Sequence, residues 1–135
     1  MAKTQRLDIV TPEKVVFSEE VEFVVAPGVE GELGFLPEHA PLVSALKTGV
    51  LRVQQGGKEF KVAISGGFVE VKNSRVVVLA DTAESEDEID VERAQEAKKR
   101  AEQRLASKTA DIDVARAEAA LQRSLARLKA AGKAS

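Results

Sequence analysis

The side chains best suited to chemistry in this chain are arginines. Six of them lie after residue 89, whereas the 135 residues include one histidine, His39, and no cysteine. Without cysteine there is no thiolate nucleophile, Cys-rich zinc site or disulfide, and a Ser-His-Asp arrangement would have to use His39. These residue types disfavour a catalytic or metal centre. They favour an anion site, because guanidinium groups bind phosphates through paired, charge-assisted hydrogen bonds.

The arginines belong to an internal repeat. With an offset of 23 residues, nine of seventeen positions from 89 to 105 recur from 112 to 128. The first copy contributes Ile89, Asp90, Val91, Arg93, Ala94, Ala97, Arg100, Arg104 and Leu105, and the second Ile112, Asp113, Val114, Arg116, Ala117, Ala120, Arg123, Arg127 and Leu128.

Both copies have the composition of helices. Residues 89–105 and 112–128 contain no Gly or Pro and are rich in strong helix formers. The short segment 107–111 between them predicts a chain reversal, and therefore an antiparallel helical hairpin. At about 100° per residue, the arginines of each helix form one stripe beside a narrow seam of alanine and leucine. Such a small apolar seam predicts a marginal hairpin that can open.

Three interpretations of the arginine stripe follow. The arginines could form an anion site between the helices, or a basic face that docks on an acidic protein surface. They could instead be a solvated face paired with Glu92, Glu96, Glu102 and Glu118, which helical spacing alone favours. Nucleic acid is disfavoured, because the chain lacks Trp and Tyr and its net charge is −2.

The first part of the chain predicts β structure. Its apolar residues alternate over short runs, as in 21–25 and 60–64, and turn residues separate the runs at 55–58 and 72–74. Many short strands predict a sandwich or barrel. The Gly- and Pro-rich segment 30–41 predicts a rigid loop, and 65–68 a tight strand junction rather than a phosphate loop.

Charge and composition divide the chain into two units. Residues up to Glu88 carry a net charge of −6 and later residues +4, while all four prolines and all five phenylalanines lie at or before Phe68. We therefore predict a β-sandwich over 1–84, an acidic linker over 85–88 and a helical hairpin over 89–135. No secretory signal or membrane-spanning run is visible, so we expect a soluble, cytoplasmic protein that reaches a membrane only through partners.

Three ordered motifs resemble a known family. GELGFLPEHAPLVSALKTG (31–49), ISGGFVEV (64–71) and VLADTAE (78–84), followed by a charged helical hairpin, are similar to the epsilon subunits of bacterial F-type ATP synthases. The resemblance implies an antiparallel N-terminal β-sandwich and a C-terminal two-helix hairpin. It also implies a non-catalytic rotor-stalk subunit, peripheral on the cytoplasmic face of the cell membrane, that couples proton flow to ATP synthesis and inhibits ATP hydrolysis.

The partners implied by the resemblance are the gamma subunit, the ring of c subunits and the alpha and beta subunits of the catalytic head. Glu32 and His39 match the family's loop that contacts the c ring. When the hairpin is extended, a basic face would meet acidic loops of the beta subunits; its residues are Arg116, Arg123 and Arg127.

The resemblance further implies that ATP is a regulatory ligand, with no catalytic cofactor and with the role of magnesium left open. The residues at the matching positions are Glu84, Ile89, Asp90, Arg93, Ala94, Arg100, Arg104, Arg116 and Arg123. ATP bound only by the compact hairpin would keep it folded. The alternative is a purely structural coupling subunit that binds no nucleotide. An independent nucleotide hydrolase is disfavoured, because the sequence has no Walker motif.

Overall fold

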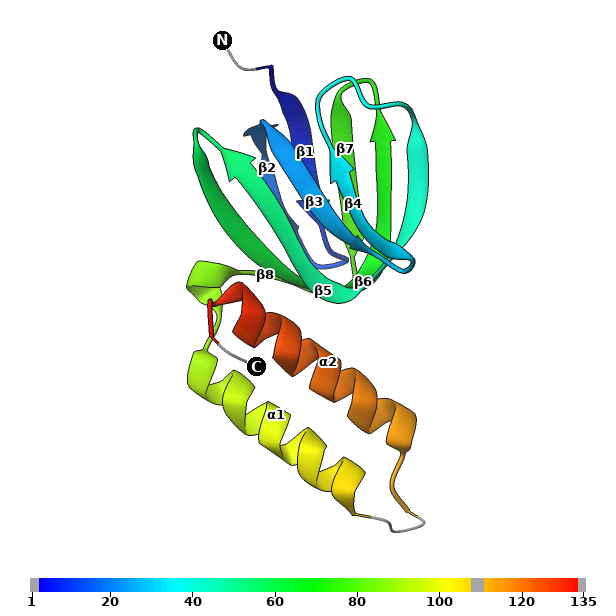
Figure 1. Cartoon of the computed structure of the whole chain (residues 1–135), viewed down its shortest axis with the longest axis vertical. Coiled ribbons are helices and arrows are strands. Elements are labelled where there is room, and N and C mark those ends of the chain that lie inside the picture. Colours follow the sequence, from blue (N-terminus) through cyan, green and yellow to red (C-terminus); the bar gives the residue numbers. More distant parts are fainter. Residues whose placement is uncertain (1–2, 108–110, 134–135) are drawn as a thin grey trace.

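The computed structural model describes residues 3–107 and 111–133. A β-sandwich forms the first part, and a pair of antiparallel helices lies against one end of it (Figure 1). The strands are β1 Gln5–Val10, β2 Val15–Val21, β3 Phe23–Gly28, β4 Gly31–Phe35, β5 Leu42–Gln55, β6 Lys58–Lys72, β7 Arg75–Ala80 and β8 Ala83–Ser85. The helices are the 3-10 turn η1 Glu86–Glu88, α1 Val91–Ala106 and α2 Val114–Ala130.

The predicted sandwich is confirmed. The strands pair in the order β2-β1-β7-β6-β5-β3-β4, and β8 pairs with β6. Neighbouring strands are antiparallel except β1 and β7, which are parallel. That pairing joins residues about 70 positions apart, so local sequence patterns could not predict it.

Both predicted hairpin turns are present. Gln55 pairs with Lys58 across Gly56 and Gly57, whose φ angles are 60° and 79°. Lys72 likewise pairs with Arg75 across two residues of positive φ. Two-residue turns of this kind match the twist of the strands they join, which explains the glycines in the first one.

The predicted loop over 30–41 is partly wrong. Gly31–Phe35 forms β4, which pairs only with β3 and so lies at the end of the strand order. Prolines are absent from these five residues, and a strand with one neighbour tolerates glycine better than a central one. The predicted junction at 65–68 lies within β6, where a Cβ at Gly67 would overlap the carbonyl oxygen of Leu79.

The sandwich interior is mainly aliphatic, with Phe35 among its buried side chains, and contains one buried charge among the described residues. Asp8 of β1 is 7% exposed. It accepts a hydrogen bond from Ser18 Oγ at 2.5 Å and pairs with Arg75 Nη2 at 3.0 Å. The Ser18 hydroxyl, together with Arg75 and Arg6, lowers the pKa of the Asp8 carboxyl even though burial acts in the opposite direction. Hydrogen bonding and positive charge therefore keep this buried group ionised.

The predicted helical hairpin is confirmed, with both helices starting two residues later than predicted. Asp90 and Asp113 are the N-caps, and their carboxylates accept hydrogen bonds from the backbone N–H groups of Arg93 and Arg116. The repeated Ile-Asp-Val-x-Arg segment thus starts a helix in each copy. Of the predicted reversal at 107–111, residues 108–110 lie outside the described residues.

The hairpin packs on the sandwich through α2. In Figure 1, α2 lies between the strands and α1. Ala126 and Ala130 of α2 pack on Val50 of β5 and Ala63 of β6, with Ile89 at the edge of this small cluster. The contact consists mainly of methyl groups, each contributing about 0.8 kcal/mol per buried carbon. The helical unit is therefore held to the sandwich by a small interface.

Candidate functional site

A pocket of about 300 Å³ lies where the sandwich, the start of α1 and the end of α2 meet. We call it the junction pocket. It is lined by Glu84, Glu88, Asp90, Arg93, Ala94 and Arg127. Glu84 comes from β8 and Glu88 from η1, while Asp90 caps α1 and Arg127 lies in the last turn of α2. The antiparallel packing of the helices brings residues from both ends of the hairpin sequence to one place.

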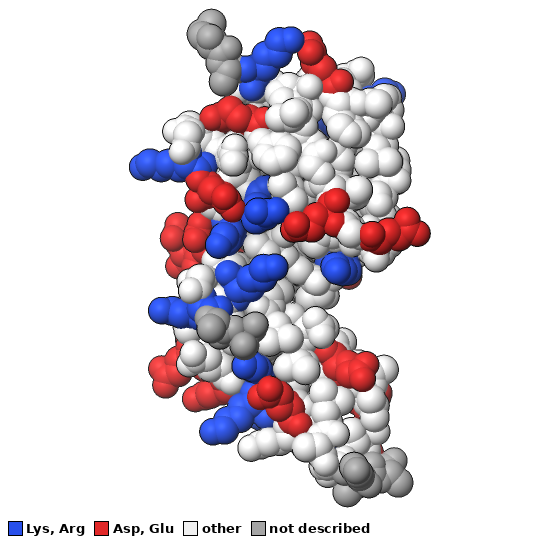
Figure 2. Space-filling model, in the orientation of Figure 1, with Lys and Arg blue, Asp and Glu red and all other residues white. Residues whose placement is uncertain are grey.

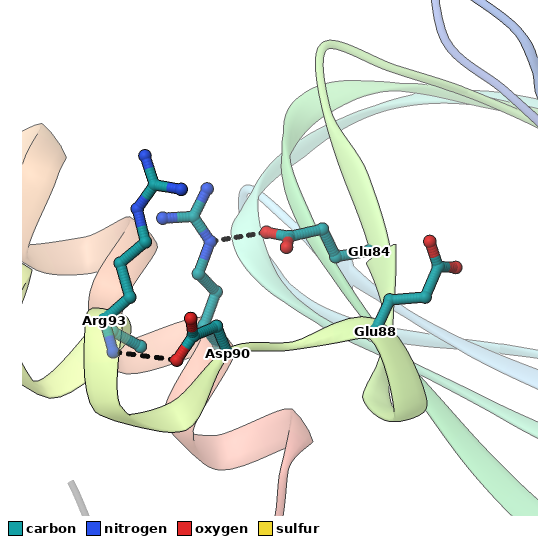
Figure 3. A pocket seen from close by; sticks show the side chains of 6 residues that line it. Glu84, Glu88, Asp90 and Arg93 are labelled. Atoms are coloured by element: carbon teal, nitrogen blue, oxygen red, sulfur yellow. Dashed lines mark hydrogen bonds and ion pairs between the residues drawn. The ribbon is translucent and has the colours of Figure 1, made fainter.

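Two hydrogen bonds organise the junction pocket. Arg127 Nε donates to Glu84 Oε1 at 2.5 Å, and the backbone N–H of Arg93 donates to Asp90 Oδ1 at 3.1 Å. Figure 3 shows Arg93 extending from the first turn of α1, while the Glu88 carboxylate points away from it. The Arg127–Glu84 pair links α2 to the sandwich, so the pocket exists only while the hairpin is docked.

The junction pocket combines groups of both charges. Arg93 is exposed and forms no ion pair with any described residue, so its guanidinium can receive an anion. The start of α1 adds the partial positive charge of a helix N-terminus. The carboxylates of Glu84 and Asp90 are acceptors for hydroxyl or amino groups. This set suits a ligand with an anionic end and a neutral, hydrogen-bonding end.

Four of the nine predicted ATP-binding residues line the junction pocket: Glu84, Asp90, Arg93 and Ala94. Ile89 packs beside the Val50 cluster, and Arg100 is exposed on α1. Arg123 lines a neighbouring space of about 10 Å³ with Ser65 and Thr82. Arg104 and Arg116 line a different pocket at the other end of the hairpin. The structure therefore divides the predicted set between two ends of the helices.

Two pocket residues were not among the predicted ATP-binding positions. Glu88 was assigned to the linker, and Arg127 only to the basic face that would meet the beta subunits. The signal for Arg127 was present in the sequence, because an antiparallel hairpin places the last turn of α2 beside the first turn of α1. Helical periodicity alone does not specify which residues meet across the hairpin.

Charges gather along the junction of the two units. On the face seen in Figure 2, basic side chains cluster where the hairpin meets the sandwich, with acidic side chains around them. Arg127 is the only hairpin arginine that forms an ion pair among the described residues, and its partner Glu84 belongs to the sandwich. No ion pair among the described residues joins a hairpin arginine to Glu92, Glu96, Glu102 or Glu118, so the structure does not show the pairing of the third interpretation.

Glu32 lies near the start of β4, and His39 follows the end of that strand. Glu32 pairs with Arg52 at 3.3 Å and lines a groove shared with α2, at the end of the sandwich that faces the hairpin. The His39 ring stands edge-on to Phe35 with centroids 5.2 Å apart, and its Nδ1 lies 2.7 Å from the Ala40 carbonyl oxygen. These contacts hold His39 against the sandwich.

An exposed apolar patch crosses three neighbouring strands. Phe68 of β6 pairs with Ala45 of β5 on one side and with Leu79 of β7 on the other, so the three side chains share a face. Phe68 is 57% exposed and Leu79 52%, and nearby Val43 is 66% exposed. Contiguous exposed apolar groups of this kind mark interaction surfaces. We call this set the β5–β7 patch.

Within the described ranges, no group of three or more His, Asp or Glu side chains could hold a metal ion. No helix among those residues is both long and apolar enough to span a membrane.

Family models match almost the whole chain. The beta-sandwich domain of the ATP synthase Delta/Epsilon chain matches residues 4–86, and the long alpha-helix domain of the same chain matches residues 87–132. The chain belongs to the ATP synthase delta/epsilon family. The two matched domains correspond to the sandwich and the helical hairpin described above.

Curated relatives in the family are epsilon chains of similar length. The ATP synthase epsilon chain of Desulforamulus reducens is 77% identical over 131 residues, covering 97% of this chain and 99% of the relative. That of Pelotomaculum thermopropionicum is 63% identical over 130 residues, covering 96% and 97%. The resemblance to epsilon subunits noted in the sequence is thus confirmed.

Solved structures of the family agree with the fold. A chain of the Euglena gracilis mitochondrial ATP synthase structure, which contains OSCP, F1 and the c-ring, superposes with a TM-score of 0.81 at 29% identity. The match covers 97% of this chain and 83% of that one. A chain from the Tetrahymena thermophila central stalk and c-ring, at 14% identity and a TM-score of 0.63, shares the fold.

Proposed function

We propose that this chain is a non-catalytic rotor subunit of a proton-translocating ATP synthase, and that its helical hairpin is a regulatory arm controlled by ATP. The family match over residues 4–132 supports the first part. The second part is supported by the junction pocket, because it unites two arginines, the start of a helix and acceptor carboxylates only when the arm is docked. We propose that the complex lies at the cytoplasmic face of the cell membrane.

ATP is the ligand that we propose for the junction pocket. Arg93 would bind phosphate oxygens at the start of α1, while Glu84 and Asp90 would accept hydrogen bonds from ribose hydroxyls or the adenine amino group. A volume of about 300 Å³ lies at the lower end of the range for small-molecule sites, about 300–1,000 Å³, so part of the nucleotide would extend into solvent. Magnesium would enter with the phosphates rather than through a protein metal site.

ATP binding would stabilise the compact arm through mass action. A ligand that binds only one state stabilises it by about 2.7 kcal/mol at a concentration 100 times its Kd. Among the described residues, a few methyl contacts and one ion pair join the hairpin to the sandwich, so a stabilisation of this size would shift the population strongly. High ATP would therefore favour the docked arm, and low ATP its release.

Release of the arm would expose the proposed inhibitory face. In the docked state Arg127 pairs with Glu84, and Arg123 lies half-buried beside Ser65 and Thr82. Arg116 is exposed. Extension of the arm would free Arg127 and Arg123. These two arginines and Arg116 would then be aligned to meet acidic loops of the beta subunits. This proposal is tested by measuring ATP hydrolysis by the assembled complex, once with the unaltered chain and once with a variant that lacks the Glu84–Arg127 pair.

The β5–β7 patch is the surface that we propose for the gamma subunit, because its exposed Phe68, Leu79 and Val43 need an apolar partner. Glu32 and His39 remain the proposed contacts with the c ring. Both surfaces belong to the sandwich, which can stay attached to the rotor while the arm moves.

Calorimetry on the full chain tests the ATP proposal. Arg93→Ala removes a charge-assisted contact worth about 1.5–3 kcal/mol, so we expect ATP affinity at the junction pocket to fall about 10- to 150-fold. Asp90→Asn keeps a side-chain oxygen that can cap α1 but removes the negative charge of the carboxylate. Lys99→Ala removes a positive charge from an exposed position of the same helix and serves as the control.

Two outcomes would contradict the proposal. Absence of ATP binding by the unaltered chain would favour the alternative, a coupling subunit that binds no nucleotide. Equal weakening by Arg93→Ala and Lys99→Ala would indicate a general charge effect rather than a site.

A further inference from the structure

The hairpin is related to itself by approximate two-fold symmetry. The repeat of 23 residues makes α2 a second copy of α1, and the two copies pack antiparallel. Each end of the hairpin therefore combines the first turn of one copy with the last turn of the other. A site built at one end from both copies has an equivalent at the opposite end.

A pocket occupies that equivalent position. It also measures about 300 Å³, and we call it the distal pocket. The described residues that line it are Arg104, Asp111, Ile112, Asp113, Arg116 and Ala117. Shifted by 23 residues, Asp90, Arg93 and Ala94 become Asp113, Arg116 and Ala117, and Arg104 becomes Arg127. Four residues of the junction pocket thus have identical counterparts in the distal pocket.

The local chemistry also corresponds. Asp113 caps α2 by accepting from the backbone N–H of Arg116 at 3.0 Å, as Asp90 does for Arg93. Arg104 lies in the last turn of α1, as Arg127 does in α2. Both distal arginines are exposed. An Arg pair from two helices beside a helix N-terminus is an arrangement that binds phosphate groups.

The two pockets differ in charge. The junction pocket has three carboxylates for two arginines, and Glu84 already holds Arg127. Among its described lining residues, the distal pocket has two carboxylates for two arginines, and neither arginine forms an ion pair with a described residue. Both guanidinium groups of the distal pocket can therefore receive an external anion, whereas in the junction pocket Arg127 is held by Glu84 and only Arg93 forms no ion pair with a described residue.

We infer that the distal pocket is a second anion site, which binds the phosphate groups of a nucleotide. The ligand class rests on the proposed function of the junction pocket; the site itself rests on the repeat and the distal arginines. The two sites would act differently. A ligand in the junction pocket joins the hairpin to the sandwich, whereas one in the distal pocket joins only α1 to α2. Distal occupancy would stabilise the hairpin whether or not it is docked.

NMR titration of the full ¹⁵N-labelled chain separates the sites. The probes are ATP and, in a second titration, inorganic pyrophosphate. We expect two groups of shifting backbone amides, residues 90–94 and residues 113–117. Arg104→Ala with Arg116→Ala should weaken binding at 113–117 at least tenfold and leave 90–94 unchanged. Arg93→Ala should do the reverse.

Two further variants guard against indirect effects. Arg104→Lys with Arg116→Lys keeps the charges without the guanidinium forks, and we expect binding intermediate between the unaltered chain and the alanine pair. Lys99→Ala should change neither group. Helical circular dichroism of each variant shows whether the hairpin is intact.

The outcomes are distinguishable. ATP shifts confined to 90–94 would overturn the distal site and leave the proposed function standing. Shifts confined to 113–117 would support the distal site and overturn the junction site. No response to either probe would overturn both, and shifts at 113–117 that persist in the alanine pair would overturn the assignment to these arginines.

Discussion

At the scale of single residues, the two aspartates of the repeat combine a structural role with a place in the two candidate sites. Asp90 and Asp113 cap α1 and α2, and each lies in a pocket. A cap is worth about 0.5–2 kcal/mol, which alone explains a repeated Asp at these positions. The pattern Ile-Asp-Val-x-Arg is therefore a helix start first. Its arginine, which contributes only a backbone group to the cap, carries the information about a ligand.

Asp8 gives the chain a predictable response to acid. Because its pKa is lowered in the folded protein, the stabilisation is present above the pKa of the unfolded chain, about 3.9, and is lost as the pH falls through the folded pKa. Asp8→Asn should lower the free energy of unfolding at pH 7 by about 1.5–3 kcal/mol, since it weakens hydrogen bonds to a charged group.

Urea unfolding at pH 7 and at pH 3 measures this effect. The difference between Asp8→Asn and the unaltered chain should shrink at the lower pH. Glu59→Gln, at an exposed carboxylate that forms no ion pair in the described part of the chain, should show little difference at either pH. If Asp8→Asn lowered the free energy of unfolding by the same amount at both pH values, packing rather than ionisation would be responsible.

At the scale of elements, the contact of α2 with β5, β6 and β8 decides the state of the arm. The apolar part is the small cluster around Val50 and Ala126, and the polar part is the Glu84–Arg127 pair. Both groups of the pair are about one third exposed, so its contribution belongs with surface pairs, about 0–1 kcal/mol. The contact that holds the arm against the sandwich is therefore small in both its apolar and its polar parts.

Removing the pair should release the arm more often. Glu84→Gln is expected to raise the population of the released state in the absence of ATP by up to about fivefold. The chain has no cysteine, so Val29→Cys and Glu102→Cys, both at exposed positions, can carry a pair of dyes for energy transfer between sandwich and arm.

The neighbouring carboxylate provides the control for this change. Glu88→Gln leaves Arg127 paired and should not alter energy transfer. In the assembled enzyme, Glu84→Gln should lower the rate of ATP hydrolysis, because more arms would be extended. An unchanged transfer efficiency would mean that the methyl contacts alone hold the arm, and an unchanged hydrolysis rate would argue against the inhibitory role.

At the scale of the whole molecule, the sequence predicts which strands and helices form better than it predicts how they pack together. Periodicity and turn residues predict the sandwich, its hairpins and both helices, because these depend on local patterns. β4 was missed since its glycines resemble a loop. The parallel pairing of β1 with β7 and the separation of Arg93 from Arg116 depend on contacts between distant segments. The predicted antiparallel hairpin already implies that Arg93 and Arg116 lie at opposite ends, but helical periodicity alone treated the arginines of both helices as one set.

The distribution of surfaces over the whole molecule predicts separable functions. Phe68→Asp in the β5–β7 patch should weaken binding to the gamma subunit at least tenfold, because a charge would be buried in an apolar contact. The free chain should stay within about 0.5 kcal/mol of its original stability, as for other exposed positions.

Calorimetric titration with purified gamma subunit measures this change. Val15→Asp is the matched control, since Val15 is 61% exposed but lies at the start of β2. ATP binding should be the same in both variants. Equal affinity of Phe68→Asp and Val15→Asp for gamma would place the interface elsewhere on the sandwich.

The position of α2 between the sandwich and α1 also bears on how the protein is made. The strands and α1 are synthesised before α2, yet α1 makes its extensive contacts with α2. On the ribosome the sandwich can fold as a unit while α1 still lacks the surface on which it packs. The arm is therefore the last part of the chain to acquire structure, and a nascent chain stopped before residue 114 would expose the alanine seam of α1 to proteases and chaperones.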